Sequence, residues 1–134
     1  MIMLFTESNT LCVIKQILNS LTFTLEPFCI TDRNECQSAR ICICADNNTA
    51  ALETLKDSQI PVITCGMNSR NTITLSSYTE TSCSLTLRRS IECINGKIIE
   101  PAEYPIKTAM PYQPYTIMSV TAIALLNGKF PISF

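Results

Sequence analysis

The chain has no histidine, no tryptophan and only three glycines among its 134 residues. Without histidine, neither a Ser-His-Asp nor a Cys-His catalytic arrangement can form. The glycines are Gly66, Gly96 and Gly128, so none precedes position 66. Both the P-loop and the GxGxxG turn use glycine to bring backbone N–H groups close to phosphates. A phosphate-binding loop of either kind is therefore excluded from the first half of the chain.

Charge is also scarce, since charged residues make up 16% of the chain and the net charge is −1. A nucleic-acid-binding protein normally presents a basic face, so we expect no nucleic-acid partner. The length fits a single domain over residues 1–134, and the 46% hydrophobic content favours a globular one. A surface with few charges also favours burial against a partner, so we expect a homodimer or a protein partner.

Long apolar runs are missing as well. The run "MIMLF" lacks a cationic leader and stops at Thr6-Glu7, which is too short for a signal peptide. The next apolar stretch, 11–25, is interrupted by Lys15 and Gln16 and again by Asn19 and Ser20, so it cannot span a bilayer. We therefore expect a cytoplasmic protein with no membrane association.

The eight cysteines are Cys12, Cys29, Cys36, Cys42, Cys44, Cys65, Cys83 and Cys93. In a cytoplasmic protein we expect them to be reduced. Several lie in apolar runs such as "ARICICAD" and "PVITCG", where a free cysteine behaves as a small hydrophobic residue. A zinc site needs four convergent ligands, and the chain has neither a CxxC pair nor a histidine. We expect no metal and no cofactor.

The first half of the chain alternates between predicted strands and helices. Strands are expected at 2–5, 23–31, 39–45 and 61–66, with a polar loop at 32–38. A helix with its apolar residues within 11–21 is expected to begin near Thr10, capped by Ser8 or Asn9, and a second is expected over 49–58. This rhythm predicts a three-layer, Rossmann-like α/β domain with a parallel half-sheet.

After Gly66 the pattern changes to strict alternation, which is typical of half-solvated antiparallel strands. Strands are expected at 72–76, 84–94 and 97–106, the last two joined by a hairpin turn at Asn95-Gly96. A C-terminal helix follows, with Pro114 in its first turn and Gly128 after its end. The turn at Gly66 is thus predicted to mark the change from a parallel sheet to an antiparallel arm.

This order of elements resembles the latter part of the central domain of the Mur ligases, the ATP-dependent amino-acid ligases of peptidoglycan assembly. The resemblance rests on "IPVITCGMNSRNTITLSS", on the "NGK" turn and on the small-residue helix "YTIMSVTAIALLNG". It covers about residues 39–128. In that family ATP is held on a glycine-rich loop ending in Gly-Lys-Thr or Gly-Lys-Ser, whereas the corresponding place here is "FTESNTLC". Thr116 stands where the family's helix has an asparagine.

These departures lead us to expect a non-catalytic relative of the Mur ligase central domain, without the family's C-terminal substrate domain. Its role would be that of a binding or self-association module. Two alternatives stay open. The domain could be a small-ligand-binding or enzymatic module, or it could be one part of a split ligase-like enzyme completed by another chain.

Ligands of open α/β sheets bind beyond the carboxyl ends of the parallel strands. The candidate ligand-binding residues in those loops are Thr6, Ser8, Asn9, Thr10, Asp46, Asn47, Asn48 and Asn68. The free N–H groups of the helix near Thr10 could hold a small anion, but Asp46 would repel one, so a neutral ligand is equally expected. The run 46–48 could instead serve only to cap the following helix.

Two further groups of charged residues have plain structural interpretations. Glu100 and Glu103 flank Pro101 and could form a carboxylate pair, but they also fit the wet side of an edge strand. Arg88 and Arg89 could hold a phosphate, but adjacent strand residues point to opposite faces, so at most one would serve a given site. We expect no catalytic residue among them.

Because no loop before Gly66 can cradle a triphosphate, we expect the protein neither to bind nor to hydrolyse ATP. Titration of the protein with Mg-ATP in a calorimeter should give no heat beyond that of dilution, while a P-loop protein in the same cell serves as the positive control. A dissociation constant in the micromolar range would contradict this expectation.

Overall fold

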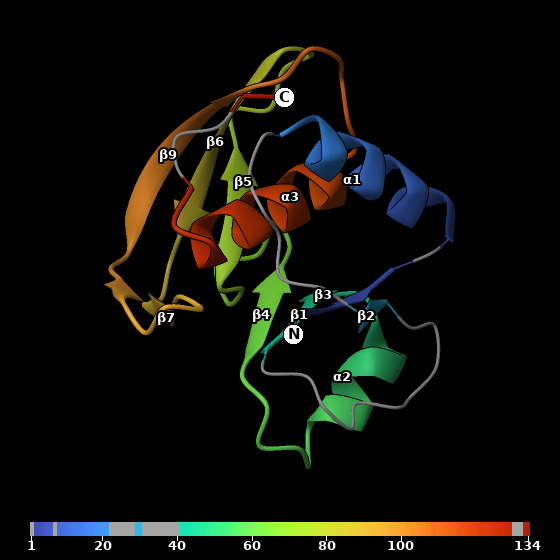
Figure 1. Cartoon of the computed structure of the whole chain (residues 1–134), viewed down its shortest axis with the longest axis vertical. Helices are drawn as coiled ribbons and strands as arrows, with labels where there is room; N and C mark the ends of the chain where they lie inside the picture. The colour runs from blue at the N-terminus through green and yellow to red at the C-terminus, as the bar shows by residue number, and fades with distance from the viewer. Residues whose placement is uncertain (1, 7, 22–28, 31–40, 130–132) are drawn as a thin grey trace.

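The structure is a computed structural model that describes residues 2–6, 8–21, 29–30, 41–129 and 133–134. In chain order the elements are β1 (Ile2–Phe5), α1 (Ser8–Ser20), β2 (Cys29–Ile30), β3 (Ile41–Ala45), α2 (Thr49–Leu55), β4 (Val62–Cys65), β5 (Ile73–Ser76), β6 (Ser82–Leu87), β7 (Ile91–Glu92), β8 (Ile98–Ile99), β9 (Ala102–Lys107) and α3 (Pro114–Leu126). Seven strands form one sheet in the order β2-β1-β3-β4-β5-β6-β9, and β7 and β8 form a separate hairpin. The predicted mixed α/β fold, with a parallel part, an antiparallel part and a C-terminal helix, is confirmed (Figure 1).

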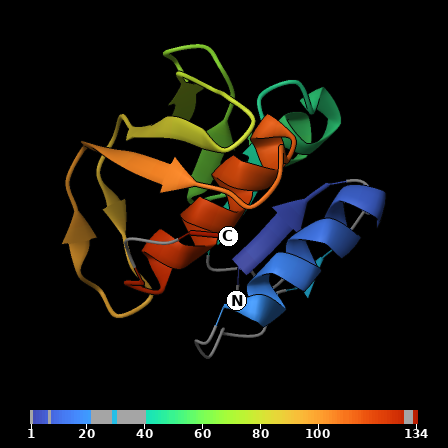
Figure 2. The same ribbon diagram turned by 90° about the horizontal axis from the view of Figure 1, so that it is seen from above.

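Helices cover both faces of the parallel part of the sheet (Figures 1 and 2). On one face, Leu4 of β1 and Ile43 of β3 belong to the core that packs under α1 and α3. On the other face, Cys42 and Cys44 pack against α2. Successive residues of a strand point to opposite faces, so the buried run "ICICA" of β3 supplies both cores at once. The prediction that Cys42 and Cys44 share a face and are buried is confirmed.

The change from parallel to antiparallel pairing comes one strand later than predicted. β5 pairs with β4 in parallel through the single pair Cys65↔Ile73, and antiparallel pairing begins between β5 and β6. Because β5 begins beside the last residue of β4, the chain reaches it without the long crossover that fully overlapping parallel strands require. The prediction that this strand is half-solvated was also wrong, since Thr72 and Thr74 are buried as well as Ile73 and Leu75.

The two long strands predicted around the Asn95-Gly96 turn are each divided. β6 and β9 pair in the main sheet, whereas β7 and β8 form the two-stranded hairpin around the turn, where Gly96 has a φ of 87°. On the return strand, Pro101 lacks the N–H that an uninterrupted ladder would need. The hairpin turn itself is confirmed, and the sequence pattern failed only in joining the segments on either side of it.

The helices differ from the prediction mainly at their ends. α1 begins at Ser8, so Asn9 lies inside its first turn rather than before it, and α2 ends at Leu55 rather than at position 58. α3 begins at Pro114, so this proline lies in its first turn as predicted, and Gly128 follows its end with a φ of 68°. The predicted strand 23–31 is described only where β2 lies, and the predicted loop 32–38 lies outside the described residues. No helix among the described segments has the length and apolar character needed to cross a membrane.

Gly66 is needed for close packing rather than for an unusual backbone angle. A Cβ at this position would lie 2.2 Å from Oδ2 of Asp46 and 2.6 Å from Nδ2 of Asn71. Those two atoms form a hydrogen bond of 3.0 Å, through which Asn71 ties the loop after β4 to the loop after β3. The Asn71 side chain is buried, and it also donates to the Asn68 carbonyl oxygen. Glycine at 66 therefore lets the two loops meet.

We expect Gly66→Ala to destabilise the protein by about 1–2 kcal/mol, because the methyl group must displace Asp46 and leave the buried Asn71 amide with one acceptor fewer. Denaturant unfolding monitored by circular dichroism measures this. Repeating the substitution in an Asp46→Ala background provides the control, since the clash with Asp46 is then gone, only the approach to Asn71 remains, and the cost should fall. An equal cost in both backgrounds would show that Gly66 has another role.

Candidate ligand-binding site

The loops chosen from the sequence do lie at one edge of the sheet. β1, β3 and β4 run parallel and in register, so the loops that follow them leave from the same side. The strand order also reverses between β1 and β3, because β2 lies on one side of β1 and β3 lies on the other. Such a reversal opens a crevice at the carboxyl ends of two neighbouring strands.

Tyr115 of α3 is bonded to the backbone at this crevice. Its hydroxyl group donates to the Phe5 carbonyl oxygen at 2.9 Å and lies 3.5 Å from that of Ile43. Burial raises the pKa of Tyr115, and the nearby thiols of Cys65 and Cys44 raise it further, so the hydroxyl stays protonated and donating. Carbonyl groups that could have faced a ligand are thus bonded to the protein itself.

The candidate residues after β3 and β4 have structural partners. Asn48 is the N-cap of α2, and its side chain accepts a hydrogen bond of 3.2 Å from the Ala51 N–H, as the capping interpretation predicts. Asn68 closes its own turn by accepting from the Arg70 N–H at 2.9 Å, and Asp46 accepts from Asn71. Asn47 is exposed.

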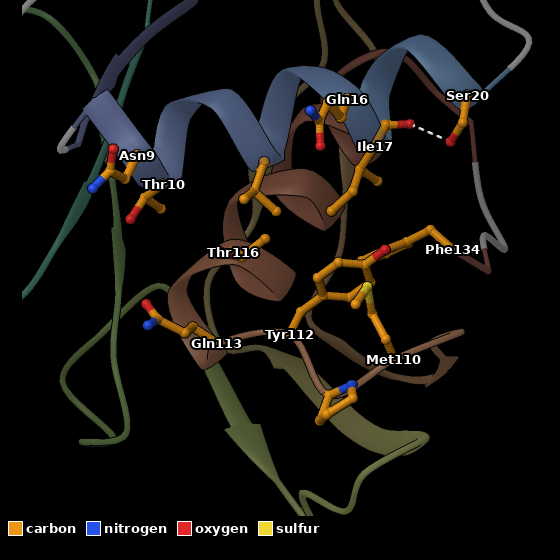
Figure 3. A pocket seen from close by; sticks show the side chains of 12 residues that line it. Asn9, Thr10, Gln16, Ile17, Ser20, Met110, Tyr112, Gln113, Thr116 and Phe134 are labelled. Atoms are coloured by element: carbon orange, nitrogen blue, oxygen red, sulfur yellow. Dashed lines mark hydrogen bonds between the residues drawn. The ribbon is translucent and has the colours of Figure 1, made fainter.

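Asn9 and Thr10, in contrast, line a groove of about 580 Å³ beside α1 (Figure 3). The groove lies between α1 and the segment 110–116 that leads into α3. Its apolar lining consists of Val13, Ile17, Met110, Pro111, Tyr112 and Phe134. Its polar lining consists of Asn9, Thr10, Gln16, Ser20, Gln113 and Thr116. The structure therefore separates the predicted residues: two belong to this groove, while Asp46, Asn47, Asn48 and Asn68 do not.

Half of the residues that line the groove come from α1. Asn9, Val13, Gln16 and Ser20 recur every three or four residues, which places them on one side of a helix. The neighbouring stripe, with Ile14 and Leu18, packs into the core. The groove wall is therefore fixed by the same helix packing that builds the fold. The side chain of Ser8, another candidate, is outside the described residues, and Thr6 is half-buried without lining the groove.

The opposite wall is held in place by several contacts. The rings of Tyr112 and Phe134 lie with their centroids 5.7 Å apart. The Tyr78 hydroxyl donates to the Tyr112 carbonyl oxygen, and the Phe134 N–H donates to the Lys107 carbonyl oxygen at 3.1 Å. An aromatic wall fixed in this way offers apolar contact at little cost in side-chain entropy.

The residues of this second wall were not among those predicted from the sequence. The segment "AMPYQP" places two prolines around an aromatic and an amide residue directly before a helix, which restricts the backbone and exposes the side chains between. The sequence pattern assigned this segment from Pro111 onward to the start of the C-terminal helix, whereas α3 begins at Pro114. Phe134 could not have been found from a local pattern, because it approaches Tyr112 only in the folded chain.

The other reactive groups of the chain favour structural roles. Burial, aided by Asp46, raises the pKa of Cys44 to about 11, and burial also raises the pKa of Cys65. Both remain thiols at neutral pH, and a thiol is a poor nucleophile and metal ligand. No group of three or more histidine, cysteine, aspartate or glutamate side chains in the described parts of the chain is arranged to hold a metal ion.

The two pairs of charged residues singled out from the sequence, the two glutamates and the two arginines, do not form a site either. Glu100 accepts a hydrogen bond of 3.0 Å from the Ser90 hydroxyl group, while Glu103 is an exposed residue of β9. Arg88 and Arg89 lie between β6 and β7 rather than on a strand, so the strand argument about their directions does not apply. Nε of Arg88 donates to Thr74, and Nη2 of Arg89 donates to the Arg70 carbonyl oxygen.

Comparison with protein-family models, with curated proteins and with solved structures found no match to this chain. The resemblance to the Mur ligase central domain therefore stays a prediction, and the groove along α1 has to be interpreted from its own chemistry.

Proposed function

We propose that the protein is a non-catalytic binding module whose groove between α1 and the entry to α3 holds a small, neutral, partly apolar molecule. The observation that carries this proposal is the lining of the groove, which combines apolar and aromatic side chains with amides and hydroxyl groups and includes no charged side chain among the described residues. Its volume of about 580 Å³ lies within the range of small-molecule sites.

The lining favours a neutral ligand for a physical reason. A charged ligand would lose hydration on entering and would meet no opposite charge there. A neutral ligand instead gains about 25 cal/mol for each Å² of apolar surface that it buries. Asn9, Gln16 and Gln113 each present a donor and an acceptor, so they can orient a ligand that carries carbonyl, amide or hydroxyl groups.

The proposal also includes a Rossmann-like fold for the parallel half of the sheet. The strand order β2-β1-β3-β4, with α1 and α2 on opposite faces, supports a Rossmann-like winding of the parallel half. We retain descent from a Mur ligase central domain as a proposal that rests on the sequence motifs. The alternative remains a split enzyme completed by another chain. Finding a ligase-type partner chain would favour it.

To test the ligand proposal, a fragment library with matched neutral, anionic and cationic members can be screened by ligand-observed NMR. We expect neutral fragments to dominate the hits. Replacing both Asn9 and Gln113 by alanine should weaken the best of them by about tenfold or more, because two hydrogen bonds are lost.

Asn47→Ala and Glu100→Ala provide matched controls, since both residues are exposed and neither lines the groove. Neither substitution should change the affinity. Loss of binding in Asn47→Ala with none in the double variant would move the site to the carboxyl ends of the strands, and predominantly charged hits would contradict the proposed ligand class.

We also expect the chain to self-associate, most simply as a two-fold dimer, because charged residues are few. The outer strand β9 carries Glu103, Pro105 and Lys107, residues that protect an edge, so strand-to-strand pairing there is not the expected contact. Light scattering at tens of micromolar should give twice the chain mass of 14.9 kDa. A monomeric mass at that concentration would rule the dimer out.

A further inference from the structure

The strand β4 has an edge that is only partly paired. Cys42 donates to the Pro61 carbonyl oxygen at 2.9 Å and Asp46 donates to that of Cys65 at 2.9 Å, so the odd-numbered residues of β4 bond to β3. Alternate residues of a strand direct their backbone groups to opposite sides. The N–H and C=O of Val62 therefore point away from β3, toward the side on which β5 lies.

β5 does not reach Val62. It meets β4 only at the pair Cys65↔Ile73, with the Gly66 N–H donating to the Ile73 carbonyl oxygen at 3.2 Å. No described residue pairs with the outward-facing backbone groups of Val62. In Figure 1 the lower half of β4 has no strand beside it on this side, and β7 lies farther away.

A groove of about 490 Å³ lies along this open edge. Val62 forms part of one side, and Ile91 and Leu126 are among the apolar residues that line it. Thr72 and Arg89 also line the groove, and the N–H of Arg88, the residue before Arg89, donates to the Thr72 carbonyl oxygen at 2.8 Å. Val62 thus has a donor and an acceptor that no described residue pairs, beside an apolar surface. These are the features that an added β-strand recognises.

The charges of the groove indicate which strand would fit. In the described residues the ion pair is Lys56 with Glu53, so Arg89 has no carboxylate partner among them. Its guanidinium makes a hydrogen bond to the Arg70 carbonyl oxygen and is otherwise exposed. An acidic side chain on the incoming strand would complement Arg89, and a basic one would complement Glu92, which also lines the groove.

We propose that this groove is a docking site for an extended peptide segment of a partner protein, which adds a strand to the open edge of β4. The peptide pairs its backbone with Val62, places apolar side chains toward Ile91 and Leu126, and carries an acidic residue opposite Arg89. This site shares no lining residue with the groove along α1, so it does not depend on the proposed small-molecule function.

The test starts from a phage-displayed library of random nine-residue peptides selected on the whole protein. We expect enrichment of peptides that combine alternating apolar residues with an acidic one. Two versions of the best synthetic peptide are then compared, one methylated on the backbone nitrogens of its odd-numbered residues and one on those of its even-numbered residues. One version should bind about tenfold more weakly and the other should bind nearly as well as the parent, because only one of the two sets of N–H groups can face β4. This comparison leaves the protein unchanged.

On the protein side, Val62→Pro removes an N–H that takes no part in the ladder to β3, and it should abolish binding. Arg89→Glu should weaken binding by about tenfold, whereas Arg70→Glu, beside it but outside the groove, should leave it within about twofold. NMR amide spectra check that each variant is folded.

Three results would overturn the proposal. The first is the absence of any enriched peptide. The second is a peptide affinity that changes neither in the two methylated peptides nor in the Arg89→Glu variant. The third is a dimer, seen by light scattering, that Val62→Pro dissociates, since the edge would then be occupied by a second copy of the chain.

Discussion

The arrangement of the molecule depends on α3, a helix with no polar face. Every residue from Thr116 to Leu126 is buried. A helix of this kind must be covered on all sides. The sheet covers one side and α1 packs along another, and the β7–β8 segment is tied to its end, where the Ile94 N–H donates to the Leu126 carbonyl oxygen at 3.0 Å. The two grooves lie near opposite ends of α3, one beside Thr116 and the other beside Leu126.

Much of the parallel half could be predicted from the sequence, because its signals are local. Apolar runs such as "ICICA" identify strands buried on both faces, and Asn48 precedes a helix that its side chain caps. The Asn95-Gly96 turn and the Pro114 helix start are likewise encoded within a few residues. In each case the backbone requirement and the residue that meets it lie next to each other in the chain.

The errors arose where distant segments decide the outcome. Alternation around 72–76 predicted a half-solvated strand, but Thr72 and Thr74 are buried, and the Arg88 side chain from beyond the next strand donates to Thr74. The surroundings of the candidate site residues also depend on distant segments. A general rule for parallel sheets placed the ligand at the strand ends, yet the Phe5 carbonyl oxygen there accepts from Tyr115, a residue 110 positions away. Likewise, the groove along α1 unites residues from both ends of the chain, so no local pattern could define it.

The two proposed sites differ in what they recognise, and the structure favours their acting independently. The groove along α1 offers side-chain amides, hydroxyl groups and an aromatic wall, which suit a compact neutral molecule. The edge of β4 offers backbone groups of Val62, which suit another backbone. Coupling between them would require α3, the element that both grooves share, to have a second stable position. Its burial on all sides disfavours one, because moving a closely packed helix opens cavities along its whole length. Occupation of one groove should therefore leave the contacts of the other in place.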